Sequence, residues 1–274
     1  MALNATMKLR KRMQAGEFIF TQTVGPGNDP EATVKALKDF GYDVIMMENE
    51  HSLVNKETIF EYIRASRKFD IPIWLRPEEK DGHFRCFMDA GINGLMIPGV
   101  NNVEEALYAV NQCYFPPIGH RGSGIGMSPY LLDSQNAAEM PLREIMNYVN
   151  NNVMLFPQTE SLEGASNLRQ ILSLEGITGT IVGTNDLVID IGDIPPKALR
   201  SELVATPAVE ENLRKIARTC KETGKVAGIG GFGPKGLAKW AKEGYTLFGL
   251  GYAIDNKLDK LEASINEMKS LLGV

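Results

Sequence analysis

The stretch Val153-Met-Leu-Phe-Pro-Gln-Thr-Glu160 begins as an apolar run and ends on a carboxylate. A second stretch, Gly179-Thr-Ile-Val-Gly-Thr-Asn-Asp186, repeats this pattern. Short apolar runs of this kind are typical of buried strands. Because neighbouring strands of a parallel sheet lie roughly 5 Å apart, two carboxylates at their C-terminal ends would face one small volume. Two such charges repel unless a cation lies between them, so the pair predicts a divalent metal site.

The alternation of an apolar run and a helical pattern continues in both directions from this stretch. Eight such repeats in about 250 residues predict a (β/α)8 TIM barrel, and runs that are apolar on both faces fit a sheet buried inside a ring of helices. A short N-terminal helix and a C-terminal helix are predicted at 5–14 and 256–272. No flexible linker divides the chain, so residues 1–274 are expected to form a single domain. The predicted strands are residues 18–24, 44–47, 73–75, 95–97, 153–156, 180–182, 226–229 and 247–250. The other predicted helices are residues 30–40, 56–68, 84–90, 103–113, 140–149, 168–174, 208–223 and 235–242.

Composition excludes several classes of protein. The net charge of −5 and the absence of a dense Lys/Arg run argue against a nucleic-acid partner. The three cysteines are far apart and have no CxxC spacing, which fits reduced thiols in a cytoplasmic protein. The N-terminus lacks the apolar core of a signal peptide, and no apolar run reaches about 18 residues. We therefore expect a cytoplasmic enzyme without a membrane partner.

Acidic and basic side chains gather at the predicted strand ends, where barrels of this class carry their chemistry. Carboxylate ligands suit a hard or borderline divalent ion such as Mg²⁺, Mn²⁺ or Co²⁺. Only two protein ligands, Glu160 and Asp186, are evident, so water and substrate would complete the coordination, as a Lewis acid requires. The other residues at these ends are Glu48, Glu50, His51, Arg76 and Gln158.

Several of these residues have a structural alternative. Glu160 and Asp186 both precede helix-like stretches and could be helix N-caps. Glu50 could make a buried structural hydrogen bond instead of acting on substrate. Arg121 lies in a long irregular segment, residues 114–134, and could brace that segment instead of binding substrate.

An ordered set of motifs between about residues 15 and 255 resembles the HpcH/HpaI aldolase family. These are class II, metal-dependent pyruvate aldolases that include 2,4-dihydroxyhept-2-ene-1,7-dioate and 2-dehydro-3-deoxyglucarate aldolases. No single motif is decisive, whereas the ordered set is specific. The matching pieces are Glu50-His51, Leu75-Arg76-Pro77, Asp89-Ala-Gly91, Ile97-Pro98, Tyr114-Phe-Pro-Pro-Ile-Gly-His-Arg-Gly122, Gln158-Thr-Glu160, Asp186-Leu187 and Gly224-Lys225.

The resemblance implies a carbon–carbon lyase that cleaves a 4-hydroxy-2-oxo acid to pyruvate and an aldehyde through a metal-stabilised pyruvate enolate. Glu160 and Asp186 would be the metal ligands. Arg76 would hold the C2 oxygen of pyruvate, and His51 would be the acid/base residue. Gln158 would lie beside the metal and the substrate.

Further expectations also come from the resemblance. Arg121 would contribute to substrate binding. Asp89 would be a catalytic residue that orients His51, although Glu48 is another candidate for that role. Family members commonly assemble as hexamers whose last helix packs on a neighbouring subunit, so a homo-oligomer is implied.

The residue types fit this chemistry independently. A guanidinium gives a developing enolate oxygen fixed donors, and a histidine that titrates near neutrality can move a proton in both directions. No strand-end lysine is placed for a Schiff base, and Lys80 and Lys225, the nearest, are expected to have surface or structural roles. An oxaloacetate decarboxylase or an enolate-trapping synthase of the same superfamily would use the same residues. A non-catalytic barrel that binds a small acid is a third alternative.

The chain departs from the family pattern at three places. It has Glu48-Asn-Glu-His51 where Asp-Gly-Glu-His is common, and Gly183-Thr-Asn-Asp-Leu187 where Gly-Pro-Ala-Asp-Leu is common. Ile125-Gly-Met-Ser-Pro129 replaces the usual Ala-Arg segment. The residues expected to bind metal and pyruvate are present, whereas the segment expected to recognise the aldehyde differs. The sequence therefore predicts the pyruvate half of the reaction and leaves the aldehyde unidentified.

Overall fold

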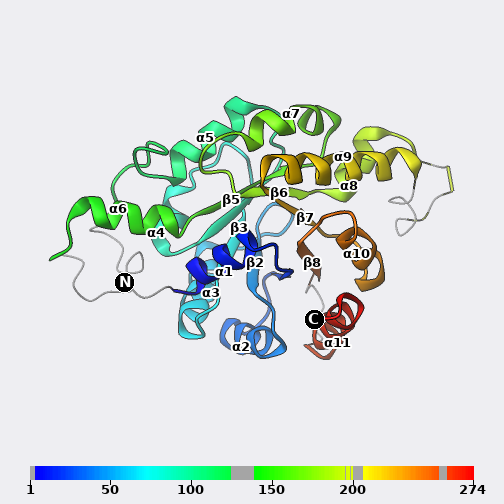
Figure 1. Ribbon diagram of the computed structural model, residues 1–274. Coiled ribbons are helices and arrows are strands. Elements are labelled where there is room, and N and C mark those ends of the chain that lie inside the picture. The colour runs from blue at the N-terminus through cyan, green and yellow to red at the C-terminus, as the bar shows by residue number, and fades with distance from the viewer. Residues whose placement is uncertain (1–3, 125–138, 195, 198, 200–205, 253–257) are drawn as a thin grey trace.

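A computed structural model describes residues 4–124, 139–194, 196–197, 199, 206–252 and 258–274. Its parallel strands close into a barrel in the order β1 to β8, with helices around it (Figure 1), so the predicted (β/α)8 barrel is confirmed. The strands are β1 (Ile19–Val24), β2 (Val44–Glu48), β3 (Ile73–Arg76), β4 (Gly94–Ile97), β5 (Met154–Thr159), β6 (Gly179–Val182), β7 (Val226–Ile229) and β8 (Leu247–Tyr252). The helices are α1 (Ala5–Gln14), α2 (Pro30–Phe40), α3 (Lys56–Lys68), α4 (Arg85–Ala90), α5 (Val103–Cys113), α6 (Leu142–Asn151), α7 (Leu162–Leu172), α8 (Thr184–Ile191), α9 (Pro207–Thr223), α10 (Pro234–Ala241) and α11 (Leu258–Leu272).

Two helices near the candidate site differ from the sequence expectation. Helix α7 begins at Leu162 rather than at residue 168, because the hydroxyl of Ser161 accepts the backbone N–H of Gly164 at 2.9 Å and caps the helix. Helix α8 was not among the predicted helices, although the residues after Asp186 were noted as helix-like, and it ends before Gly192, which has a φ of 73°. The predicted residues 125–134 of the irregular segment and 256–257 of the last helix lie outside the described residues.

Helix α1 packs against the apolar interior of the barrel. Its residues Leu9 and Met13 belong to one buried cluster with residues of five strands. Inside this cluster the rings of Trp74 and Phe156 lie 4.8 Å apart. Figure 1 shows α1 lying across one end of the ring of strands. The barrel interior is therefore packed, and α1 covers the N-terminal ends of its strands. The strand residues of the cluster are Ile19, Val44, Met46, Trp74, Met154, Phe156 and Leu247.

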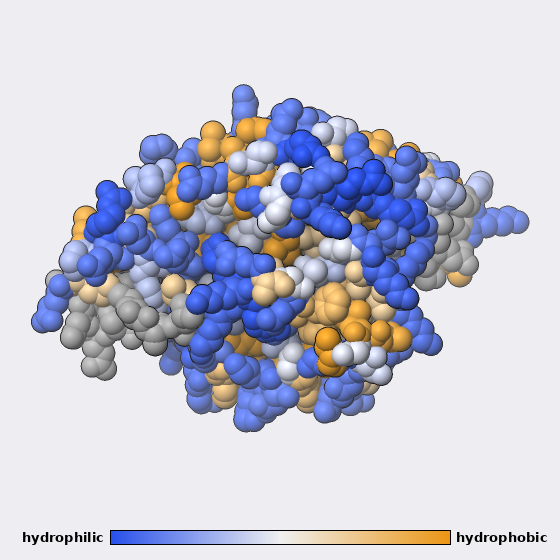
Figure 2. Space-filling model, in the orientation of Figure 1, coloured by the Kyte–Doolittle hydropathy of each residue, from blue (hydrophilic) through white to orange (hydrophobic). Residues whose placement is uncertain are grey.

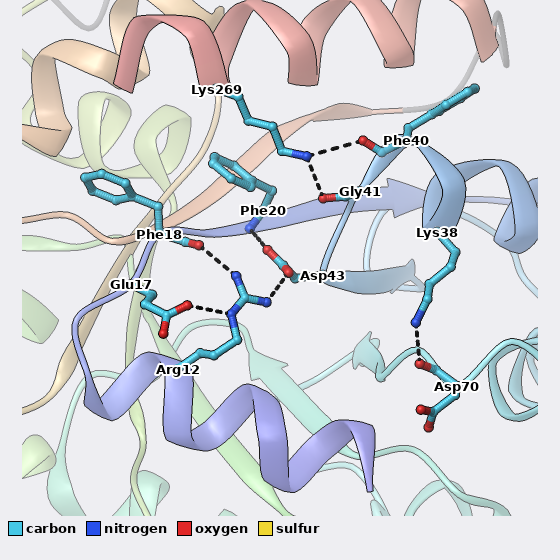
Figure 3. Close-up of polar contacts among 10 residues, drawn as sticks. All are labelled: Arg12, Glu17, Phe18, Phe20, Lys38, Phe40, Gly41, Asp43, Asp70 and Lys269. Atoms are coloured by element: carbon cyan, nitrogen blue, oxygen red, sulfur yellow. Dashed lines mark hydrogen bonds and ion pairs between the residues drawn. The ribbon is translucent and has the colours of Figure 1, made fainter. Parts of the chain in front are cut away.

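Polar contacts fix α1 to the start of the barrel (Figure 3). The guanidinium of Arg12 lies 2.8 Å from Glu17 and also pairs with Asp43. It donates to the carbonyl of Phe18 at 3.4 Å. The second oxygen of Asp43 accepts the backbone N–H of Phe20 at 2.9 Å. Arg12 and Asp43 thus join α1, the start of β1 and the start of β2.

The last helix, α11, packs against α10 and α2 of the same chain. Lys269 donates to the carbonyls of Phe40 and Gly41 at 3.4 and 3.3 Å, at the C-terminal end of α2 (Figure 3). Hydrophilic residues cover most of the face shown in Figure 2, and an apolar area lies over the α10–α11 region. Leu271 and Val274, at the end of the chain, are exposed. Of the helices described here, none is both long and apolar enough to cross a membrane.

Candidate functional site

The ends of β2 and β3 hold a buried ion pair. Glu48 lies opposite Arg76 in the register of these two strands. Arg76 Nε donates to Glu48 Oε2 at 2.6 Å, and Arg76 Nη2 pairs with the same carboxylate. A third contact joins Arg76 Nη1 to Glu50 Oε2 at 3.1 Å. Because planar guanidinium–carboxylate pairs are directional, these contacts fix the orientation of Arg76.

The same carboxylate shapes the turn that carries His51. Glu48 Oε1 accepts the backbone N–H groups of Glu50 and His51 at 2.8 and 3.0 Å. The ring Nε2 of His51 lies 3.5 Å from Glu50 Oε2, and the His51 side chain is 62% exposed. Glu48 thus fixes the backbone of His51, while Glu50 contacts its ring. His51 stands at the rim of the site, accessible to solvent and substrate.

The end of β5 supplies Gln158 and Glu160. Glu160 Oε1 accepts the backbone N–H of Gly99 at 2.5 Å, and Oε2 accepts a hydrogen bond from Gln158 Nε2. The other amide atom, Gln158 Oε1, is buried without a hydrogen-bond partner among the described residues. A Cβ at Gly183 would lie 2.3 Å from Glu160 Oε2, so the glycine leaves the space that Glu160 occupies.

Asp186 belongs to the first turn of α8, whereas the sequence pattern indicated a strand end. It lines a cavity of about 90 Å³ that Arg76 and Gln158 also line. The helix N-caps are Ser161 for α7 and Gly183 for α8. The N-cap alternative for the two carboxylates is therefore wrong.

Burial and neighbouring carboxylates raise the pKa values of Glu160 and Glu50. Burial raises the pKa of Glu160 to about 7; the Gly99 N–H opposes the shift, and the charges of Glu50 and Asp186 add to it. Burial also raises the pKa of Glu50; the positive charge of Arg76 opposes this rise, and the negative charge of Asp186 adds to it. Such mutual repulsion is relieved by a cation.

The donor set fits a divalent metal ion. Glu160 and Asp186 are hard oxygen donors whose charges interact, and the unpartnered oxygen of Gln158 adds a neutral donor. In the parts of the chain that the structure describes, no group of three or more His, Cys, Asp or Glu side chains is arranged around one metal position.

Asp89 and Arg121 contact each other away from the carboxylates of the candidate site. Arg121 Nη2 pairs with Asp89 at 2.5 Å, and the Arg121 side chain is fully buried. Arg121 lines a cavity of about 150 Å³ with Asn93 and Val153, which precede β4 and β5. This cavity is at the N-terminal end of the barrel, opposite the carboxylates. Within one chain the pair braces the segment after α5 against α4, and the predicted roles of both residues at the catalytic site stay predictions.

The two lysines considered for a Schiff base both make structural contacts. Lys225 Nζ donates to the carbonyl of Ile177 at 2.6 Å, at the start of β7. Lys80 Nζ donates to the carbonyl of Gly99 at 3.1 Å and pairs with Glu105 at 2.6 Å. Gly99 and Glu105 were not among the residues predicted from the sequence. The Pro-Gly dipeptide directly after β4 was the available signal of a turn at this point.

Comparisons with known proteins identify the family of this chain. The chain is 27% identical over 198 residues to a 4-hydroxy-2-oxo-heptane-1,7-dioate aldolase of Escherichia coli, covering 72% of this chain and 71% of that protein. It is 29% identical over 202 residues to a hydroxypyruvate/pyruvate aldolase of Roseovarius nubinhibens, covering 73% of each. The crystal structure of an HpcH/HpaI aldolase from Desulfitobacterium hafniense superposes with a TM-score of 0.79 at 21% identity, covering 95% of this chain and 96% of that one. The sequence profile described as HpcH/HpaI aldolase/citrate lyase matches residues 25–256. The chain therefore belongs to the HpcH/HpaI aldolase/citrate lyase family, and it is an enzyme of the lyase class.

Proposed function

We propose that this enzyme is a divalent-metal-dependent, class II aldolase that cleaves a 4-hydroxy-2-oxo acid to pyruvate and an aldehyde. The observation that carries the proposal is the arrangement of Arg76, Gln158 and Asp186 around one cavity, with Glu160 hydrogen-bonded to Gln158. Buried carboxylates that repel one another lower the stability of the fold unless a cation binds between them. Such a group beside a fixed arginine is therefore a candidate site for a cation and an anionic substrate. The names of the two aldolase relatives support the reaction class.

Glu160 and Asp186 are the proposed ligands of Mg²⁺, Mn²⁺ or Co²⁺, with Gln158 beside them. When bound, the ion would act as a Lewis acid on the oxygens of the 2-oxo acid. Gln158 Nε2 holds one oxygen of Glu160 and the Gly99 N–H holds the other. The Glu160 carboxylate therefore has a fixed orientation before any ligand binds, which lowers the cost of ordering it on binding.

Arg76 and His51 would carry the bond cleavage. His51 accepts the proton of the C4 hydroxyl group, the C3–C4 bond breaks, and the C4 carbonyl leaves as the aldehyde. The electron pair of the broken bond enters the enolate of pyruvate, whose C2 oxygen accepts hydrogen bonds from Arg76. The proton that His51 took up then passes to C3, which gives pyruvate and returns His51 to its neutral form. Glu48 and Glu50 hold the guanidinium in place during this step.

Product analysis tests the proposal. The protein with Mn²⁺ is incubated with pyruvate and a panel of short aldehydes, and separately with oxaloacetate. A 4-hydroxy-2-oxo acid detected by NMR in the first incubation is the expected result. Decarboxylation of oxaloacetate without any aldol product would replace the aldolase with a decarboxylase of the same superfamily. If the folded protein is inactive in both incubations, the result would favour the third alternative, a barrel that binds a small acid without catalysis.

A homo-oligomer is also proposed, on the family resemblance and on the exposed apolar residues Leu271 and Val274 at the end of α11. Light scattering coupled to gel filtration measures the mass in solution. A mass that is a multiple of the 30.2 kDa chain is the expected result, and a monomer at micromolar concentration contradicts it.

A further inference from the structure

The turn after β4 connects Glu160 to a lysine outside the cavity. Gly99 has a φ of +59°, a conformation that favours glycine. Its N–H donates to Glu160 Oε1 at 2.5 Å, while its carbonyl accepts from Lys80 Nζ at 3.1 Å. A Cβ at this position would lie 3.9 Å from both Glu160 Oε1 and Lys80 Cδ, so the residue sits between the two side chains.

The lysine is itself held in place from α5. Lys80 Nζ pairs with Glu105 Oε1 at 2.6 Å. The other oxygen, Glu105 Oε2, accepts the backbone N–H of Asn101 at 2.7 Å. Lys80 and Glu105 thus bind the turn at both ends, one through the carbonyl of Gly99 and one through the N–H of Asn101. These charge-assisted hydrogen bonds are stronger than neutral ones.

A second set of contacts fixes the turn against α7. The hydroxyl of Ser161 donates to Asn101 Oδ1 at 2.6 Å, and the amide of Asn167 donates to the Asn101 carbonyl at 2.9 Å. Ser161 is also the N-cap of α7 and directly follows Glu160. With the α7 side fixed in this way, Lys80 holds the peptide group that follows the Cα of Gly99, and the peptide group that precedes it donates to Glu160.

We propose that Lys80 is a positioning residue for Glu160: by holding the carbonyl of Gly99, it aims the Gly99 N–H at one carboxylate oxygen and so sets which oxygen is presented to a metal ion. This proposal rests on the proposed function, because it takes Glu160 to be a metal ligand. Lys80 touches neither metal nor substrate. Partners of this kind outside the ligand set commonly change metal affinity by about 10- to 100-fold when they are removed.

The variant Lys80→Met tests the proposal, because it keeps the length of the side chain and removes the ammonium group. The Lys80–Glu105 pair that the variant loses is partly exposed in the parent protein. Such pairs contribute little to stability, so the variant is expected to fold. We expect its Kd for Mn²⁺, measured by electron paramagnetic resonance of the free ion, to rise about 10-fold. Lys80→Arg is expected to restore most of the affinity, because a guanidinium can also donate to the Gly99 carbonyl.

A matched control and a second variant keep the result interpretable. Lys35 pairs with Asp39 on the surface of α2, so Lys35→Met removes a lysine–carboxylate pair away from the site and should leave the Kd unchanged. Glu105→Gln leaves Lys80 in place and weakens its anchor, so it should raise the Kd in the same direction as Lys80→Met.

The outcomes separate the two proposals. If the parent protein binds Mn²⁺ and both Lys80→Met and Glu105→Gln bind it with the parent Kd, the positioning role is wrong and the proposed function stands. If the folded parent does not bind Mn²⁺, the metal-dependent function fails and the positioning role fails with it. A fall in melting temperature without a change in Kd would assign Lys80 a purely structural role.

Discussion

Glu48 and Arg76 lie opposite one another at the ends of β2 and β3 and form an ion pair whose side chains are each only 4% exposed. The second oxygen of Glu48 accepts the backbone N–H of His51 at 3.0 Å. One buried carboxylate therefore orients both the arginine proposed to hold the pyruvate oxygen and the turn that carries the proposed base. The sequence left Glu48 and Asp89 as alternative supports for His51, and the structure shows this contact for Glu48.

Glu48→Gln should lower both stability and activity. A glutamine oxygen can still accept the N–H groups of Glu50 and His51, but the buried charge of Arg76 loses one of its two carboxylate partners and keeps Glu50. Removing the partner of a buried charge costs about 3–5 kcal/mol, so with Glu50 in place the loss should be no larger than this, and urea unfolding measures it. Glu48→Asp is the control, because it keeps the charge and should lose less stability. A Glu48→Gln protein as stable as the parent would contradict the role given to the pair.

Arg76→Lys should separate metal binding from chemistry. The ammonium group keeps the charge beside Glu48, so the fold is retained, but it loses the planar set of donors. We expect a fall of about 10²-fold or more in the rate of pyruvate enolisation, as for the loss of a donor to a developing oxyanion. The Kd for Mn²⁺ should stay close to that of the parent. Enolisation at the parent rate would show that Arg76 does not act on the enolate oxygen.

The metal-free protein should lose stability as the pH rises from about 4.5 to about 7. Burial, together with the charges of Glu50 and Asp186, raises the pKa of Glu160 from 4.5 to about 7. The folded state therefore retains a proton that the unfolded state releases in this window, and the stability present below the lower value is lost as the pH passes the higher one. The shift corresponds to at most about 3 kcal/mol. Melting temperatures measured with a chelator across this range test the prediction.

Two variants identify the source of that pH dependence. Glu160→Gln cannot ionise, so its metal-free stability should be nearly flat across the same window. Glu163→Gln changes an exposed carboxylate in the first turn of α7 and should keep the parent profile. Added Mn²⁺ should raise the melting temperature of the parent most above about pH 7, where Glu160 is ionised, and should not raise that of Glu160→Gln. Equal profiles for all three proteins would exclude Glu160 as the titrating group.

Gly183→Ala should disturb the metal site without strain in the backbone. The φ of Gly183 is −81°, which alanine adopts readily. The added Cβ would lie 2.3 Å from Glu160 Oε2 and 2.5 Å from Gln158 Nε2, so at least one of these side chains must move. We expect the Kd for Mn²⁺ to rise about 10-fold or more. Gly233→Ala is the matched control, because its Cβ would have nothing within 4 Å.

The barrel could be predicted because its signals are local. Apolar runs mark the strands, and glycines such as Gly41 and Gly224, which end α2 and α9 in the left-handed region, separate the repeats. Helix α8 was noted only as a helix-like stretch after Asp186 and was not among the predicted helices, because its run Leu187-Val-Ile-Asp-Ile191 is rich in β-branched residues, which favour strands. Tertiary packing of Leu187 and Val188, both buried, overrides that preference.

The candidate site could be predicted only in part, because strand ends are readable in the sequence and contacts between loops are not. The sequence predicted that Arg76, Gln158 and the carboxylates meet at one end of the barrel. It did not predict that Arg121 pairs with Asp89 at the other end, since the position of residues after α5 depends on the packing of α4. The contact of Lys80 with the Gly99 turn joins residues far apart in the sequence and has no local signature.

Exchange of the methyl protons of pyruvate in D₂O, followed by NMR, tests the central claim most directly, because it needs no knowledge of the aldehyde. We predict exchange in the presence of Mg²⁺, Mn²⁺ or Co²⁺ and its loss on adding a chelator, since the enolate requires both the ion and Arg76. Folded protein that binds Mn²⁺ but catalyses no exchange with any of the three ions would contradict the aldolase mechanism.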